Sequence, residues 1–233
     1  MIGRNGARAL AAAALITLAV TACGGLQPED PGKALTEAGA AMAKLKTVSA
    51  TLKFTKGTVS FQGYVLTGAN ASVRLPADSD TTYKVRYQDV LISLEVVIAG
   101  GHVFLRAPFA GFTELKGATA ADIPDVAKLF DVNTGLPAMI PAGQNPRYIG
   151  AEKVGDVDSH KVGATYSAAQ IRKLLPQLAS SGDVTVTIWI GGSDHLIRKA
   201  VLEGPFGDGG AASAVEIDLS GFNAAIAISS PTP

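Results

Sequence analysis

The chain has 233 residues, and its 20 basic and 20 acidic side chains give a formal net charge of zero. A balanced charge excludes the basic surface that nucleic-acid binding requires. One cysteine excludes an intramolecular disulfide bond and a cysteine-rich zinc site, while a hydrophobic fraction of 47% is sufficient for a large core.

Residues 1–22 have the pattern of a secretion signal, with Arg4 and Arg8 before an apolar run and small residues at its end. A membrane-spanning helix needs about 20 apolar residues, and this run is shorter. We therefore expect residues 1–22 to be removed. The mature chain would then be slightly negative, because both arginines are lost.

Cys23 ends a segment that resembles a bacterial lipobox, Leu18-Ala19-Val20-Thr21-Ala22-Cys23. At a lipobox the cysteine sulfur receives a diacylglyceryl group and the chain is cleaved before the cysteine. Two acyl chains hold a protein on a bilayer, at about 0.8 kcal/mol per buried CH₂. We predict a lipid anchor at Cys23 on the outer face of the cell membrane, a tether over 23–32 and one domain over 33–233. A cysteine that merely ends an ordinary signal peptide is the alternative.

The first element of the domain is a helix. Asp30 and Pro31 are a capping residue and a first-turn proline, and apolar residues follow at helical spacing, which predicts an amphipathic helix over about 31–46. Apolar and polar residues then alternate, which predicts a meander of short antiparallel strands. The alternating apolar positions run from Val48 to Phe54, Val59 to Val65, Tyr83 to Tyr87, Ile92 to Ile98 and Val103 to Leu105.

A helical insertion interrupts these strands. Asp122 can cap a helix that carries Val126, Leu129 and Phe130. The apolar segment 136–141 follows as a loop or short helix, and either lies over a pocket or packs in an ordinary core.

Strands return at about 148–155 and 159–165. Ser167 is expected to cap a helix that Pro176 kinks or shortens. A hairpin over 184–202 turns at Gly191-Gly192-Ser193-Asp194, and strands at about 211–219 and 222–228 complete the sheet.

Catalytic signatures are missing from the sequence: it has no G-x-S-x-G, no H-E-x-x-H and no phosphate-binding glycine loop. His102, His160 and His195 each lie beside a predicted turn, which favours solvated side chains over a catalytic base. Asp156-x-Asp158-x-His160 lacks the later residues of a calcium loop and is interpreted as a hairpin turn. We therefore expect no catalytic residues, no metal site and no cofactor.

Three stretches resemble the LppX/LprA/LprF/LprG family of mycobacterial lipoproteins, which are similar in fold to the periplasmic LolA-like carriers. The stretches are Ala43-Lys44-Leu45-Lys46-Thr47-Val48, Asp131-Val132-Asn133-Thr134-Gly135-Leu136, and Val186-Thr187-Ile188-Trp189-Ile190 with Asp194-His195-Leu196. Their order and spacing, with the lipobox, cover nearly the whole mature chain.

The resemblance implies an α+β fold in which a curved antiparallel sheet, a half-open β-barrel, carries helices on its concave side. A hydrophobic cavity between them would accept acylated lipid or glycolipid, with a lipid export transporter as a further partner. The residues that would line this cavity are Val96, Ile98, Phe130, Leu136, Met139, Ile140, Val186 and Ile188. A register error of one residue would reverse the strand positions among them.

Three functions follow from these patterns. The first is a lipid carrier with no bond-making step, since a dry apolar lining suffices to bind hydrocarbon. The second is a structural or signalling lipoprotein with a solid core that binds a protein partner. The third is a hydrolase of envelope lipids, whose Ser, His and Asp would assemble from distant loops.

Overall fold

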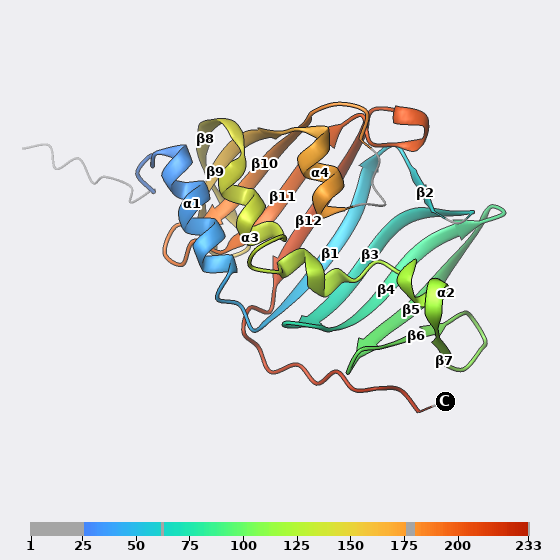
Figure 1. Ribbon diagram of the computed structural model, residues 1–233. Coiled ribbons are helices and arrows are strands. Elements are labelled where there is room, and N and C mark those ends of the chain that lie inside the picture. Colours follow the sequence, from blue (N-terminus) through green and yellow to red (C-terminus); the bar gives the residue numbers. More distant parts are fainter. Residues whose placement is uncertain (1–25, 62, 176–179, 233) are drawn as a thin grey trace, which may run out of the picture.

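The computed structural model describes residues 26–61, 63–175 and 180–232 (Figure 1). The predicted signal segment and Cys23 lie outside these residues. Twelve strands of the described chain form one antiparallel sheet in the order β7-β6-β5-β4-β3-β1-β12-β11-β10-β9-β8, with β2 paired to β3.

The strands are β1 (Thr47–Lys56), β2 (Val59–Phe61), β3 (Tyr64–Arg74), β4 (Asp78–Tyr87), β5 (Val90–Ala99), β6 (His102–Arg106), β7 (Thr113–Leu115), β8 (Gln144–Val154), β9 (Val157–Tyr166), β10 (Val184–Gly191), β11 (Ile197–Gly204) and β12 (Ser213–Ser220). The α-helices are α1 (Pro31–Met42), α2 (Gly117–Ala121), α3 (Leu136–Met139) and α4 (Ala168–Leu174). Three short 3₁₀ helices are η1 (Val126–Phe130), η2 (Ile140–Ala142) and η3 (Asp208–Gly210).

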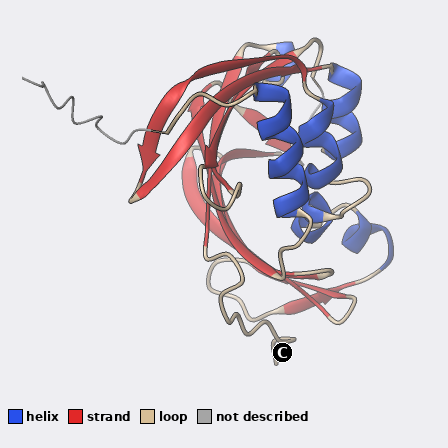
Figure 2. Cartoon of the chain, turned by 90° about the vertical axis from the view of Figure 1, so that its left-hand side faces the viewer, coloured by secondary structure: helices blue, strands red, loops and turns tan. Residues whose placement is uncertain are grey.

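The sheet is strongly curved, and helices α1, α3 and α4 lie on its concave side (Figures 1 and 2). Most strands follow their neighbour along the chain, so each half of the sheet is a meander. The two halves meet where β1 pairs with β12. The α+β architecture with an open, curved antiparallel sheet confirms the predicted fold class.

Helix α1 begins where the sequence predicts it. The Asp30 carboxylate accepts a hydrogen bond of 2.7 Å from the backbone N–H of Lys33, with Pro31 in the first turn. Its apolar face is buried, and a fully buried side chain such as Leu35 contributes about 1.5–3 kcal/mol. The helix ends at Met42, earlier than the predicted end near residue 46.

Apolar side chains pack on both faces of the sheet. The larger cluster joins the concave face to α1, η1 and the α3–η2 segment. A smaller cluster on the convex face joins Val97, Ala99 and Phe104 to Ile228 near the C-terminus, with Ile226 packed against it.

The predicted helix with Asp122 as its N-cap is wrong. Asp122 follows the C-terminal end of α2, and the next helical turn, η1, begins after Asp125, whose carboxylate accepts a hydrogen bond of 3.1 Å from Ala127 N–H. Pro124 explains the break, because a proline disfavours helical backbone at the residue before it, here Ile123.

The predicted strand over 222–228 is also wrong. Gly221 and Asn223 have φ of +60° and +56°, which turns the chain away from the sheet after β12. The Asn223 side chain accepts a hydrogen bond of 2.8 Å from Lys46 N–H, and Thr47 Oγ1 donates one of 2.7 Å to the Ala224 carbonyl oxygen. These bonds fix the turn and direct the following residues to the convex face.

The other predicted elements of the second half are confirmed. Ser167 begins α4 with a capping box in which Ser167 and Gln170 bond to each other's backbone N–H groups. The hairpin of β10 and β11 closes through a hydrogen bond of 2.9 Å from Gly191 N–H to the Leu196 carbonyl oxygen. Helix α4 ends at Leu174, and Pro176, which was expected to affect it, lies outside the described residues.

Candidate functional site

One apolar surface extends over the whole concave face of the sheet. Directly paired residues on antiparallel strands point to the same side, so the register defines a row of side chains on one face. From β8 to β5 this row is Tyr148, Val162, Ile188, Ala200, Ile217, Leu52, Ala69, Tyr83 and Leu94. Nearly all of its members are apolar, as the binding of hydrocarbon requires.

The four strand residues predicted to face inward do lie on this concave face. Val186 is two residues from Ile188 on β10, and Val96 and Ile98 follow Leu94 at spacings of two on β5, so alternation places all of them on the same side. Their exposed fractions are between 3% and 7%. Their role as lipid contacts stays a prediction.

The four residues predicted from the helical segment lie in one cluster with Val186 and Ile188. Phe130 and Ile140 are buried, and Leu136 and Met139 are partly buried against the cluster, which also includes Leu35 of α1. Helix α1 and the α3–η2 segment approach so closely that a Cβ at Gly39 would lie 2.7 Å from the Pro137 carbonyl oxygen. Side chains therefore fill the space between this half of the sheet and its helices.

Val96 and Ile98 lie on the other half of the concave face, outside that cluster. Three polar residues on β4, Ser79, Thr81 and Tyr83, share the face with them. The Tyr83 hydroxyl donates a long hydrogen bond of 3.5 Å to the Pro124 carbonyl oxygen, and burial raises the pKa of Tyr83 to about 12.

Thr81 is 1% exposed, and its hydroxyl has no hydrogen-bond partner among the described residues. The sequence analysis missed these polar positions as site residues. In the sequence, these residues alternate with neighbours that face the convex side of β4, and this alternation was the signal that could have placed them together on the other face.

The surface of the described chain has hollows, and two of them are well defined. One of about 300 Å³ is lined by Thr82, Glu95 and Arg106 of the convex face and by residues 107–110. The other, of about 340 Å³, lies between α1 and the β10–β11 turn and includes His195. Neither hollow is lined by any of the eight residues predicted to line the cavity.

The three histidines have different environments. His102 is exposed, and its Nδ1 lies 2.8 Å from Glu114 Oε1. His195 is partly buried in the β10–β11 turn, with a φ of +56°. The prediction of a solvated side chain is wrong for His160, which is 5% exposed because it lies within β9 and not in the turn at 155–156.

The curved sheet with its concave helical layer is the fold of mycobacterial lipoproteins of known structure. LprF of Mycobacterium bovis superposes with a TM-score of 0.70 over 87% of this chain and 97% of that protein, at 18% identity. LppX of Mycobacterium tuberculosis superposes with a TM-score of 0.61 over 86% of this chain and 100% of that one, also at 18% identity.

Comparison of the sequence with family models identifies the family. The model of the LppX_LprAFG lipoprotein family matches residues 30–228, and the chain belongs to this family. A protein of Mycolicibacterium hassiacum named lipoarabinomannan carrier protein LprG is 34% identical over 128 residues, which are 54% of either chain. The protein of that name from Mycolicibacterium smegmatis is 27% identical over 127 residues, 54% of this chain and 53% of its own. The match thus spans about half the length of these two relatives.

Among residues 26–61, 63–175 and 180–232, no helix combines the length and the apolar character needed to span a membrane. The relatives named above are lipoproteins and carriers, and none has an enzyme name.

Proposed function

We propose that this chain is a carrier of acylated lipid or glycolipid in the cell envelope, anchored to the membrane through Cys23. The continuous apolar concave face, which crosses nine strands, is the observation that carries the proposal. Membership of a lipoprotein family supports it, as do the two relatives named as lipoarabinomannan carriers. Binding would involve no bond-making step.

The hydrocarbon tails would lie against the concave face, between the sheet and its helical layer. Because the half beneath α1 is filled by side chains, tails can enter there only if the helical layer moves. Helix α3 has four residues and η2 has three, and helices this short depend on packing rather than on their own stability. Each methylene that is buried would contribute about 0.8 kcal/mol, less the cost of exposing the side chains that it displaces.

The proposed entrance is the half of the concave face that β4 and β5 form. Val96 and Ile98 lie there outside the filled cluster, beside the hydroxyls of Thr81 and Tyr83. Since Thr81 is 1% exposed, a polar headgroup would form a hydrogen bond to its hydroxyl once the side chains that cover it move, while the tails extend over the apolar residues.

The second candidate function is that of a surface lipoprotein that binds a protein partner. The filled space beneath α1, where Ile188 and Leu35 are 3% and 1% exposed, favours it. A protein of this kind needs no hollow, so it would contain no bound lipid.

The experiment uses neighbouring residues on opposite faces of β5. The chain from residue 26 is expressed in a mycobacterium, purified without detergent, extracted with organic solvent and analysed by mass spectrometry. Leu94→Trp places an indole on the concave face, and the matched control Ser93→Trp places the same indole on the exposed convex face.

We expect lipid with the wild-type chain and with Ser93→Trp, and several-fold less with Leu94→Trp. Equal thermal melting curves for the two variants would show that both fold. A wild-type chain that repeatedly contains no lipid would contradict the carrier function. Equal lipid in both variants would contradict binding on the concave face of β5.

A further inference from the structure

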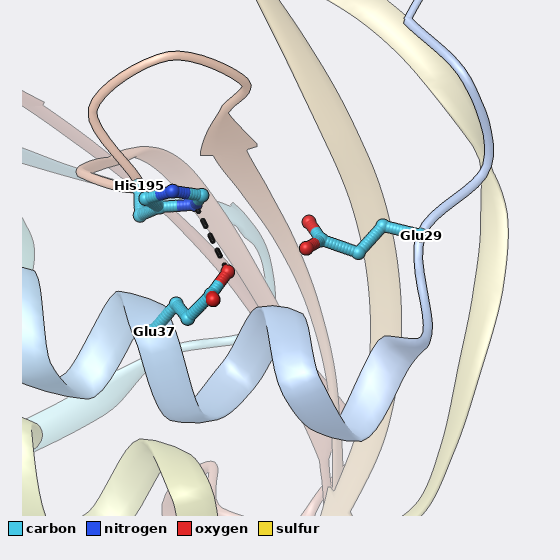
Figure 3. A group of neighbouring side chains, drawn as sticks. All are labelled: Glu29, Glu37 and His195. Carbon is cyan, nitrogen blue, oxygen red and sulfur yellow. Dashed lines mark ion pairs between the residues drawn. The ribbon is translucent and has the colours of Figure 1, made fainter.

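Three side chains with metal-binding atoms meet at the start of the fold. Glu29 comes from the tether, Glu37 from α1 and His195 from the β10–β11 turn (Figure 3). One carboxylate oxygen of each glutamate and one imidazole nitrogen lie within 4.8 Å of one another. The Glu37 Oε2 to His195 Nδ1 distance is 3.5 Å. Glu37 follows Glu29 by 8 residues and His195 follows Glu37 by 158, so the sequence alone does not indicate that the three meet.

The outer oxygen of each glutamate pairs with Lys33, while the atoms that face into the cluster lack hydrogen bonds. Lys33 Nζ lies 2.6 Å from Glu29 Oε1 and 3.0 Å from Glu37 Oε1. Glu29 Oε2, Glu37 Oε2 and His195 Nδ1 are buried and have no hydrogen-bond partner among the described residues. The two carboxylates thus share one lysine.

A fourth side chain, from the sheet, lies next to Glu29 but outside the group of three. His160 of β9 has a side chain that is 7% exposed, and its Nε2 lies 3.5 Å from Glu29 Oε2. The Nδ1 of this side chain is buried and has no hydrogen-bond partner among the described residues, and its ring packs edge-on against Tyr148. His160 Nε2, which faces Glu29, is the nitrogen that a cation beside this carboxylate would use as a ligand.

We propose that Glu29, Glu37 and His195 bind a divalent transition-metal cation of the zinc class, with His160 as the fourth ligand. Imidazole nitrogen and carboxylate oxygen are donors that zinc accepts at about 2.0–2.2 Å, and four of them complete a tetrahedral shell. Ligand atoms in such a shell are roughly 3.3 Å apart. Since the three atoms now lie within 4.8 Å, side-chain rotations are enough to close the site.

The cluster joins the tether to the body of the fold, so a bound cation would hold these two parts together. Glu29 precedes α1 in the predicted tether, while Glu37 and His195 belong to the body of the fold. The tether already lies against the β10–β11 turn, because the Leu26 side chain occupies the space that a Cβ at Gly192 would need. A bound cation would therefore hold residues 26–30 of the tether against the body of the fold. The hollow that includes Glu37 and His195 gives the cation a route to the site.

In the test, zinc chloride is titrated into the full-length chain in detergent, and isothermal titration calorimetry measures the heat of binding. The single-site variants are Glu37→Gln and His195→Gln, which keep the side-chain size. The matched control is His102→Gln, which removes an exposed histidine that also lies beside a glutamate, Glu114. Cys23 is present in every sample, so any binding of zinc to its thiol is the same in all.

We expect one zinc ion per wild-type chain at micromolar affinity, unchanged in His102→Gln and at least tenfold weaker in both site variants. In hydrogen exchange, zinc should slow the amides of residues 26–30 in the wild type and in His102→Gln only. Should Glu37→Gln not fold, Glu29→Gln takes its place. Affinity that is equal in all variants, or no zinc-dependent protection of the tether, would overturn the proposal.

Discussion

The Tyr166 hydroxyl donates a hydrogen bond of 2.9 Å to the backbone carbonyl oxygen of Ile140 and so joins strand β9 to the helical layer. The two residues are 1% and 2% exposed. Burial raises the pKa of the Tyr166 phenol well above its ordinary value, so the hydroxyl keeps its proton and remains a donor at neutral pH. This bond fixes the position of η2 over the sheet.

Tyr166→Phe should destabilise the fold by about 0.5–1.5 kcal/mol, because the buried Ile140 carbonyl oxygen loses the Tyr166 donor and keeps only a longer hydrogen bond of 3.3 Å from Gly143 N–H. Urea unfolding measures the loss, and hydrogen exchange should be faster in residues 136–143. Tyr87→Phe is the control, because Tyr87 is 44% exposed. Equal stability of the two variants would show that the hydrogen bond does not hold the helical layer.

Two glycines of α1 should respond to alanine in opposite directions. A Cβ at Gly39 would lie 2.7 Å from both the Pro137 carbonyl oxygen and Pro141 Cγ, so Gly39→Ala forces α1 away from the α3–η2 segment at a cost of about 1–3 kcal/mol. A Cβ at Gly32 would meet its nearest atom, in the Asp30 side chain, at 3.4 Å. Gly32→Ala should stabilise the fold by about 0.5–1 kcal/mol, because alanine restricts the unfolded chain.

Thermal melting of both variants under the same conditions checks this pair. No loss of stability in Gly39→Ala would contradict the close approach of α1 to the α3–η2 segment, and a loss in Gly32→Ala would contradict the open space around Gly32.

That two residues share a face of a strand was predictable, because alternation is local. Val96 and Ile98 stand at a spacing of two, as do Val186 and Ile188, which places each pair on one face. The pattern does not identify the concave face, because the apolar residues between them, such as Val97 and Trp189, are buried on the other side. The pattern was insufficient at residues 222–228. Ile226 and Ile228 do bury their side chains, but against the convex face, because the backbone turns at Asn223.

Features that depend on distant residues could not be predicted from local patterns. Asp122 and Asp125 are both good caps by composition, and only the position of Pro124 and the hydrogen bond to Ala127 distinguish them. His160 lies four residues after a turn, yet the chain is already within β9 and is covered by Glu29 of the tether. The packing of α1 on the α3–η2 segment likewise appears only when the chain is folded.

The free energy of unfolding should fall at acid pH, and protonation of Asp78 should account for part of this loss. Gly100 N–H donates a hydrogen bond of 3.0 Å to this carboxylate, Arg74 lies 2.8 Å from it, and both lower its pKa. A carboxyl with a lowered pKa in the folded state stabilises the protein above its unfolded pKa of about 3.9, and this stability is lost as pH falls through the folded pKa. Because the Arg74 side chain is 43% exposed, we expect about 1 kcal/mol.

Urea unfolding of the wild type and Asp78→Asn from neutral to acid pH measures this contribution. The difference between them should be largest near neutrality and should disappear below the folded pKa. Asp89→Asn is the control, since Asp89 is exposed and asparagine also adopts its φ of +66°. A difference that persists at the lowest pH would assign the effect to side-chain packing instead of charge.

Thr81→Val should stabilise the fold by about 1–2 kcal/mol, because it replaces a buried hydroxyl without a hydrogen-bond partner by a methyl group of the same shape. Thr82→Val is the control on the convex face, where the change should be within about 0.5 kcal/mol. Urea denaturation measures the free energy of unfolding of both variants and of the wild type.

The same pair bears on the proposed carrier function, because Thr81 lies between Ala71 and Val96 in the concave register. If only hydrocarbon contacts this position, Thr81→Val should retain as much lipid as the wild type in mass spectrometry. If a headgroup bonds to the hydroxyl, the variant should gain stability and lose lipid. A variant that loses stability would show that the hydroxyl has a partner in the lipid-free fold, and the concave face would then be less purely apolar than its register indicates.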